Sequence, residues 1–244
     1  MLAIRWRFPD APLRRGVVLA SVVGFLTVTG FAAAERGRLH LSALYPPKTA
    51  VLFGVMMAIA IGFVSDHHPY SQFGPANYVT TIRVMLVALI ASLIGEPAAP
   101  LFAMSTAVVV AGLDGFDGWL ARRSRMLSDF GARYDMETDA AFVLALSVLA
   151  WQYGKAGTWV LLSGLMRYFF VAAAWLLPWM GRPLRPTSRG KTICVIQMIG
   201  LIMVISPRVA ATVSARVAAG ALAALSLSFA IDVMGLWRSR PVAN

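Results

Sequence analysis

Six acidic residues gather in one short polar stretch of an otherwise apolar chain. The stretch, residues 114–139, reads DGFDGWLARRSRMLSDFGARYDMETD and holds more than half of the eleven Asp and Glu residues of the protein. Its carboxylates are Asp114, Asp117, Asp129, Asp135, Glu137 and Asp139. Carboxylates are costly beside apolar, membrane-type segments, so their concentration here indicates a function. The chemistry that suits them is the binding of a hard divalent cation, which prefers oxygen ligands.

The spacing of four of these acids sorts them into two pairs. Asp114 and Asp117 lie three residues apart, and Asp135 and Asp139 lie four residues apart, so each pair occupies one face of a helix. The apolar runs on either side would bring the pairs together across a short turn. Converging carboxylates repel one another unless cations neutralise them, and paired Mg²⁺ or Mn²⁺ ions are a known arrangement for phosphoryl displacement. The stretch therefore predicts a site for two such ions, with a solvated charged loop as the alternative.

Small and basic residues between the acids suit a substrate that carries phosphate. Gly115, Gly118 and Gly131 have no side chain and would let a substrate approach the helix backbone closely. Arg122 and Arg123 add planar guanidinium groups, whose donors match the oxygens of a phosphate.

The elements that must position this stretch are membrane helices. Of the 244 residues, 59% are apolar and 14% are charged, against about 25% charged in soluble domains. Apolar runs occupy residues 16–34, 49–64, 78–94, 100–114, 140–152, 157–179, 192–206 and 217–237. Because a backbone in lipid must satisfy its own hydrogen bonds, these runs predict an all-α, polytopic membrane helical bundle. We expect one helical bundle with a pair of helices added at the N-terminus.

Membrane topology accounts for the net charge of +11. The basic residues lie at the ends of the apolar runs, which fits topology and anionic headgroups of membrane lipids better than nucleic acid. With the N-terminus inside, the inner connections hold fourteen basic residues and the outer connections hold six. Cytoplasmic loops carry the excess of Lys and Arg. Both termini and the acidic stretch are therefore expected on the cytoplasmic face of the cell (inner) membrane.

Two adjacent histidines are the other potential metal ligands near a membrane face. His67 and His68 follow the second apolar run. Because neighbouring residues of a helix do not face one site, the pair is expected to lie in a solvated loop rather than at a metal.

The acidic stretch also resembles the signature of a known family. The spacing Asp-x-x-Asp-Gly-x-x-Ala-Arg, eight residues, Gly-x-x-x-Asp-x-x-x-Asp is kept at Asp114, Asp117, Gly118, Ala121, Arg122, Gly131, Asp135 and Asp139. This pattern is similar to that of the CDP-alcohol phosphotransferases, also called CDP-alcohol phosphatidyltransferases, and eight fixed positions make it specific. Asn77-x-x-Thr80-x-x-Arg83 resembles the opening of that family's first core helix. The likeness covers about residues 75–237. It implies a six-helix catalytic membrane domain, residues 75–244, preceded by an N-terminal extension with two transmembrane helices, residues 1–74.

The resemblance implies a reaction and a role for each residue. CDP-diacylglycerol would bind with its diphosphate on the metals, the hydroxyl of a small polar alcohol would attack the phosphorus next to the lipid, and CMP would leave. Asp114, Asp117 and Asp135 would be metal ligands, and Asp139 would be the general base and a further ligand. The nucleotide and diphosphate would contact Asn77, Thr80, Asp114, Gly118, Ala121, Arg122, Ser128 and Gly131. The family likeness also implies a homodimer.

The sequence leaves the acceptor alcohol open. Arg167 lies within an apolar run and could hold an anionic acceptor, with a structural ion pair as the alternative. Arg185, Arg189 and Lys191 form a basic rim that suits the same ligand, although the topology rule would also place them there. Met, Glu and Thr fill positions 136–138, where relatives that use glycerol phosphate usually have Pro and Ala. Inositol phosphate, glycerol phosphate, serine and choline therefore all stay open.

Two other functions remain as alternatives. The acids could line the path of a cation transporter or channel, but the outer halves of the apolar runs carry few polar residues that could continue such a path. A catalytically inactive relative could serve as a membrane scaffold, but all eight signature residues are present.

Overall fold

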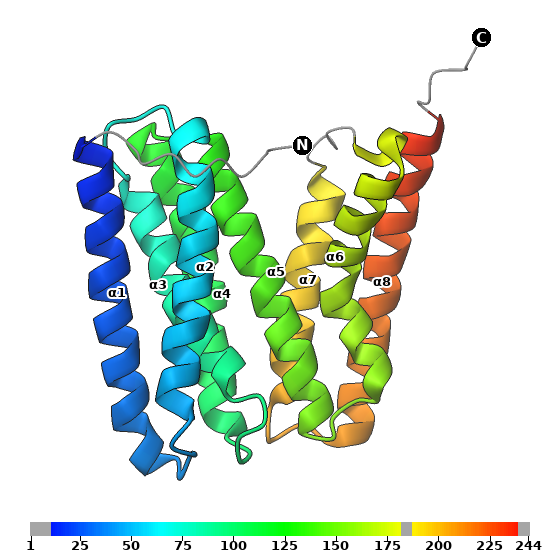
Figure 1. Cartoon of the computed structure of the whole chain (residues 1–244). Helices are drawn as coiled ribbons and strands as arrows, with labels where there is room; N and C mark the ends of the chain where they lie inside the picture. The colour runs from blue at the N-terminus through cyan, green and yellow to red at the C-terminus, as the bar shows by residue number, and fades with distance from the viewer. Residues whose placement is uncertain (1–10, 182–186, 239–244) are drawn as a thin grey trace. The chain divides into compact units, whose positions relative to one another are not determined.

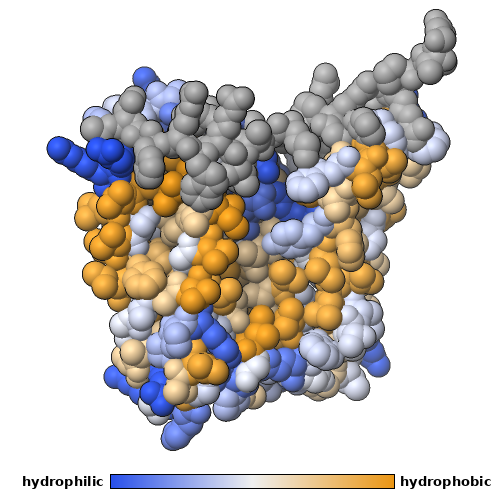
Figure 2. Space-filling model, in the orientation of Figure 1, coloured by the Kyte–Doolittle hydropathy of each residue, from blue (hydrophilic) through white to orange (hydrophobic). Residues whose placement is uncertain are grey.

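Long helices make up the computed structural model of the chain (Figure 1). The structure describes residues 11–181 and 187–238, and these residues contain helices and connections without a β-strand. Seven of the described helices are long and apolar enough to cross a membrane, which is typical of a multi-pass membrane protein. On the face drawn in Figure 2, hydrophobic residues cover the middle of the helices and hydrophilic residues gather toward their ends. The predicted all-α, polytopic class is thereby confirmed.

The first of two compact units contains α1 (Ala11–Arg38), α2 (Tyr45–His67), α3 (Pro75–Ser92), α4 (Pro100–Ser124) and α5 (Asp129–Gln152) as far as residue 145. α1 packs against α2 and α3, α2 packs against α3, and α3 packs against α4. Proline stands in the first turn of α2, α3 and α4, where its missing N–H costs no helical hydrogen bond. The boundary predicted after residue 74 lies in the connection between α2 and α3, inside this unit.

The second unit begins at residue 146, within α5. It continues through the 3₁₀ turn η1 (Thr158–Val160), α6 (Leu161–Leu176), the 3₁₀ turn η2 (Pro178–Gly181), α7 (Ser188–Ile205) and α8 (Ala211–Arg238). α7 packs along α8, and α6 also contacts α8.

α5 differs from the other long helices in its charge. The sequence predicts eight spans, and seven described helices have the composition for one. The first eleven residues of α5 hold five charged side chains, namely Asp129, Arg133, Asp135, Glu137 and Asp139. Its apolar part, residues 140–152, is about 20 Å long, whereas a hydrocarbon core is about 30 Å thick. The apolar part of α5 is therefore too short to cross the hydrocarbon core by itself.

A buried carboxylate ties the α1–α2 link to the α3–α4 connection. The Glu96 carboxylate accepts hydrogen bonds from the Ser42 backbone N–H (2.8 Å), the Ser42 hydroxyl (2.7 Å) and the Lys48 Nζ (2.7 Å). Burial opposes ionisation of this carboxyl, but the bonds from Lys48 and Ser42 outweigh it, so the pKa of Glu96 lies below its ordinary value. The contact helps to hold the N-terminal pair of helices on the rest of the first unit.

We expect Glu96→Gln to lower the free energy of unfolding by about 1–3 kcal/mol at pH 7, because charged hydrogen bonds are lost in a buried place. A carboxyl whose pKa is depressed by folding stabilises the protein above its unfolded pKa of about 4.3, and this stabilisation is lost as pH falls toward the folded value. The difference between the two proteins should therefore be full at pH 7 and shrink below about pH 4.3. Thermal unfolding of both proteins in detergent, at pH 7 and at pH 3.5, measures this difference in stability.

Glu35→Gln is a matched control for this prediction. Glu35 pairs with Arg38 at 3.0 Å within α1, where the Arg38 side chain is 78% exposed and the Glu35 side chain 13%. An ion pair between helical neighbours with one end in solvent contributes less than about 1 kcal/mol, so this variant should unfold much more like the wild type than Glu96→Gln does at pH 7. A Glu96→Gln effect that is equally large at pH 3.5 would show that the carboxylate charge is not its cause.

Candidate metal and nucleotide site

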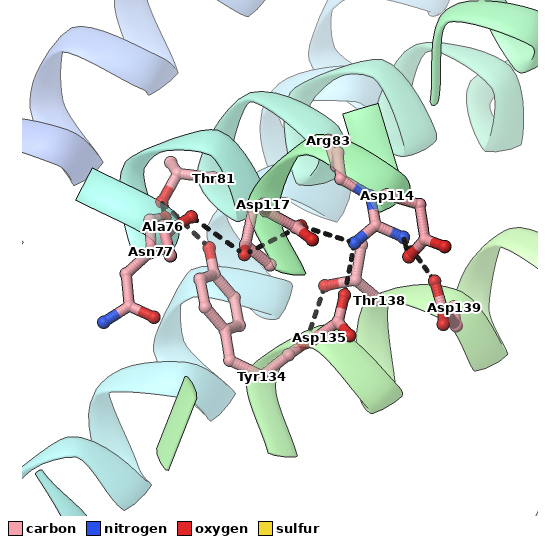
Figure 3. A network of polar contacts seen from close by, with 11 residues as sticks. Ala76, Asn77, Thr81, Arg83, Asp114, Asp117, Tyr134, Asp135, Thr138 and Asp139 are labelled. Carbon is pink, nitrogen blue, oxygen red and sulfur yellow. Dashed lines mark hydrogen bonds and ion pairs between the residues drawn. The ribbon is translucent and has the colours of Figure 1, made fainter. Parts of the chain in front are cut away.

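The four predicted aspartates converge on one buried arginine (Figure 3). Arg83, near the middle of α3, has a fully buried side chain. Its guanidinium lies 2.7 Å from Asp114 and 2.7 Å from Asp117, both on α4. The same group also pairs with Asp135 and Asp139 of α5. One cation thus links three helices of the first unit.

Helical spacing explains how each element presents its side chains. Asn77, Thr80 and Arg83 follow one another at three-residue intervals, so they share the buried face of α3. The Thr80 hydroxyl lies on this face 3.3 Å from the Asp117 carboxylate. The next residue, Thr81, shares a 3.1 Å hydrogen bond with the buried hydroxyl of Tyr134. α3 therefore contributes the buried polar side chains that the aspartates of α4 and α5 contact.

Three of the aspartates are placed to hold a metal ion. Asp114, Asp135 and Asp139 each offer an oxygen atom, and these atoms lie within 4.8 Å of one another. The fourth, Asp117, is the most buried of the set and contacts Thr80 and Arg83. Four carboxylates and one guanidinium leave the group with three formal negative charges. An all-oxygen ligand set with excess negative charge fits a hard divalent cation, so the residues present suit Mg²⁺ or Mn²⁺.

A cavity of about 150 Å³ adjoins the aspartates within the first unit. A water molecule fills about 30 Å³ of liquid, so the cavity has room for a group of several atoms. Its wall contains seven of the eight residues predicted to contact the nucleotide and diphosphate, which are Asn77, Thr80, Gly118, Ala121, Arg122, Ser128 and Gly131. Asp117 and Asp135 also line it. The eighth predicted residue, Asp114, is one of the four aspartates that pair with Arg83.

A tight turn brings the cavity walls together. α4 ends at Ser124, the next residue, Arg125, has a φ of 54° in the left-handed region, and α5 begins at Asp129. The Gly131 backbone N–H donates to the Ser128 hydroxyl at 3.1 Å, as in an N-terminal helix cap. A Cβ atom at Gly131 would lie 3.1 Å from Asn77 Oδ1 and 3.3 Å from Ser128 Oγ. Glycine at this position thus allows α5 to approach α3.

Gly131→Ala is expected to weaken nucleotide binding about tenfold or more, because its Cβ would push two cavity-lining side chains apart. Gly112→Ala is the matched control, since Gly112 lies in α4 before the acidic stretch and a Cβ there meets no atom within 4 Å among the described residues. Titration calorimetry with CMP and Mg²⁺ compares the two variants. Equal losses in both would show that helix propensity, and not the cavity, is responsible.

Two residues that contact the site were not assigned a role from the sequence. Arg83 appears there only as part of the helix-opening pattern, although a charged residue inside an apolar run is itself a signal of function. His68 was expected in a solvated loop, and this expectation is wrong. Its side chain is buried, with 6% of the residue exposed, and it contacts Ser128. Aromatic packing against Phe130 draws the imidazole inward.

The residues predicted for the acceptor belong to the second unit. Arg167 is half-buried in α6, and Lys191 is exposed in the first turn of α7. Arg189 of α7 forms an ion pair with Asp232 of α8, so its charge is already matched within the unit. Arg185 lies outside the described residues. Acceptor binding by these residues stays a prediction.

The fold and the site together define a polytopic membrane protein with an acidic cluster beside a cavity. A family model described as CDP-alcohol phosphatidyltransferase matches residues 73–231, well over half of the chain. The chain therefore belongs to the CDP-alcohol phosphatidyltransferase family, and the predicted resemblance is confirmed. Neither the curated proteins nor the solved structures that were searched contain a match to it. Membership supports a transferase of phospholipid synthesis that uses a CDP-alcohol donor and an alcohol acceptor.

Proposed function

We propose that the protein transfers the phosphatidyl group of CDP-diacylglycerol to the hydroxyl of a small polar alcohol and releases CMP. The observation that supports this most is the cavity. Residues that the family pattern assigns to the nucleotide line it, and Asp117 and Asp135 belong to the same wall. The donor diphosphate would thus lie next to the carboxylates that can hold metal ions.

The reaction needs a nucleophile, a path for its proton and a stable leaving group. The alcohol oxygen forms a bond to the phosphorus that carries the lipid, and the bond from that phosphorus to the oxygen of CMP breaks. Asp139 accepts the proton of the alcohol, since a carboxylate within hydrogen-bond reach can act as a general base. Divalent cations, when bound, would neutralise charge on the diphosphate and on the departing CMP.

Different residues of this chain are proposed to bind the metal ions, the nucleotide and the acceptor. Asp114, Asp117, Asp135 and Asp139 would hold two Mg²⁺ or Mn²⁺ ions. Arg122, which lines the cavity and is exposed, has the planar donor group that suits a phosphate oxygen. Asn77, Thr80, Gly118, Ala121, Ser128 and Gly131 would surround the rest of the nucleotide. Arg167, Arg185, Arg189 and Lys191 are proposed to bind the acceptor, with or without a phosphate.

The proposed setting is the cell (inner) membrane, with the site and both termini on the cytoplasmic side. The basic residues at the ends of the helices support this orientation. A homodimer is proposed from family membership.

A CMP-release assay tests the function. The purified full chain is incubated in detergent with CDP-diacylglycerol, Mg²⁺ or Mn²⁺, and a panel that includes glycerol phosphate, inositol phosphate, serine and choline. CMP release with one acceptor, abolished by EDTA and restored by added Mn²⁺, is the expected result. A folded protein that releases no CMP with any acceptor of the panel would contradict the proposal.

A further inference from the structure

A histidine of the N-terminal extension lies directly behind one wall of the cavity. His68 follows the last residue of α2 and is buried. It contacts Ser128, which lines the cavity. The matched family region begins at residue 73, so this contact comes from a part of the chain outside it.

Two contacts determine where the protons of the His68 ring lie. Nε2 is 2.8 Å from the carbonyl oxygen of Gln72. A carbonyl oxygen can accept but not donate, so Nε2 carries a proton and donates it. In the uncharged ring Nδ1 then has a free lone pair, and it lies 3.0 Å from the Ser128 hydroxyl. The Ser128 hydroxyl therefore donates a hydrogen bond to Nδ1 of His68.

The connection that carries His68 is anchored on the turn between α4 and α5. The Tyr70 hydroxyl donates to the backbone carbonyls of Arg125 (3.2 Å) and Leu127 (3.0 Å). The His68 ring also packs edge-on against Phe130, with ring centroids 5.6 Å apart. These contacts hold the imidazole in one orientation, so its Nδ1 atom is a fixed acceptor for Ser128.

The hydrogen-bonding capacity of the Ser128 hydroxyl is thereby almost used up. A hydroxyl has one proton and two lone pairs. The proton forms the hydrogen bond to His68 Nδ1, and one lone pair accepts a hydrogen bond from the Gly131 backbone N–H at 3.1 Å. One lone pair remains for the cavity that Ser128 lines. Toward a ligand in this cavity, Ser128 is consequently a hydrogen-bond acceptor.

We propose that His68 is a positioning residue, which makes Ser128 an acceptor for a donor group of the bound nucleotide. The inference rests on the proposed function and narrows it. An ionised phosphate oxygen cannot donate a hydrogen bond, so the phosphates belong on the side of the cavity that Arg122 lines. A ribose hydroxyl or the exocyclic amine of cytosine can donate, and one of these groups contacts Ser128. The N-terminal extension thus takes part in nucleotide recognition.

Two substitutions separate the two contacts of the imidazole. His68→Asn places an amide oxygen near the position of Nδ1 and keeps an acceptor for Ser128. His68→Gln reaches the position of Nε2 and keeps a donor for the Gln72 carbonyl, but it removes the acceptor. Ser128→Ala removes the hydroxyl itself, and with it the partner of Nδ1 and of the Gly131 N–H, but it leaves the imidazole and its bond to Gln72 in place. Thermal unfolding of each variant confirms that it is folded before binding is measured.

Titration calorimetry on the full chain, in detergent with Mg²⁺ at pH 8, uses CMP, UMP, 2′-deoxy-CMP and 3′-deoxy-CMP as ligands. UMP replaces the exocyclic amine by a carbonyl, and each deoxy analogue lacks one of the two ribose hydroxyls, so the three analogues together identify the donor. The wild type should bind CMP about five- to tenfold more tightly than one of these analogues. His68→Asn should keep this preference. His68→Gln and Ser128→Ala should lose it, and the double variant should lose no more than Ser128→Ala alone.

Each other outcome has a distinct meaning. A preference for CMP that survives in His68→Gln, or losses that add up in the double variant, would overturn the role of His68. A folded wild type that binds neither CMP nor any of its analogues would contradict the proposed function and this inference together. CMP binding in the wild type with equal analogue affinities would leave the proposed function intact and exclude the acceptor role of Ser128.

Discussion

Asp139→Asn is expected to lower the rate of CMP release at least a hundredfold while it leaves nucleotide binding within a few fold of the wild type. Asparagine has nearly the shape of aspartate but cannot accept the proton of the attacking alcohol, and general-base catalysis is worth about 10²–10⁴ in rate. The two quantities are measured separately, as turnover with the active acceptor and as the CMP dissociation constant in the presence of Mg²⁺.

Glu137→Gln is the control for this variant. Glu137 lies two residues before Asp139 on α5, with its side chain partly exposed and 3.8 Å from Arg133. It is not part of the Arg83 cluster of ion pairs, so its removal should change turnover by less than about threefold. If Asp139→Asn loses nucleotide binding as strongly as turnover, Asp139 acts chiefly as a metal ligand. Normal turnover in Asp139→Asn would exclude it as the base.

The second large effect is expected at Arg83. Arg83→Gln removes the one guanidinium that contacts all four aspartates and leaves four buried or half-buried carboxylates without it. Breaking a buried ion pair on one side costs about 3–5 kcal/mol. In EDTA the variant should therefore unfold at a much lower temperature than the wild type. Added Mn²⁺ should raise its unfolding temperature by more than that of the wild type, because a bound cation replaces the missing charge.

This prediction follows from a competition for the same oxygen atoms. The carboxylate oxygens that contact Arg83 include those of Asp114, Asp135 and Asp139, which are also the three placed for a metal. Arg123→Gln is the control, since Arg123 is exposed and lies over the ring of Trp119, 5.2 Å from its centroid. A loss of stability in Arg83→Gln that Mn²⁺ does not relieve would show that Arg83 acts by packing rather than by charge.

Sequence periodicity predicted the parts of the site that depend on one helix at a time. Asp114 with Asp117, and Asp135 with Asp139, are helical neighbours, and the structure places both pairs around the same group. The helices themselves were predicted from long apolar runs, which are typical of membrane spans and not of soluble folds. These features depend on spacing along the chain, which a sequence displays directly.

The parts that could not be predicted depend on contacts between helices. Arg83 and Asp139 are 56 residues apart, and their contact depends on how α3 and α5 pack. His68 was expected in solvent because two adjacent histidines suggest a loop, whereas its burial depends on Phe130 and Ser128, about 60 residues later. α5 is long enough for a span, but its charged first half distinguishes it from its neighbours. Spacing along one segment contains no information on such partners.

The burial of Arg83 also bears on how the protein is assembled in the bilayer. α3 is synthesised before its partners, since Asp117 follows Arg83 by 34 residues and Asp139 by 56. A charged arginine at the centre of a membrane helix costs about 2.5–3.5 kcal/mol on insertion scales. α3 should therefore insert poorly when it is made without α4 and α5, and a translation assay with truncated chains measures this. The aspartates then serve twice, first by drawing α3 into the membrane during biogenesis and later by forming the site.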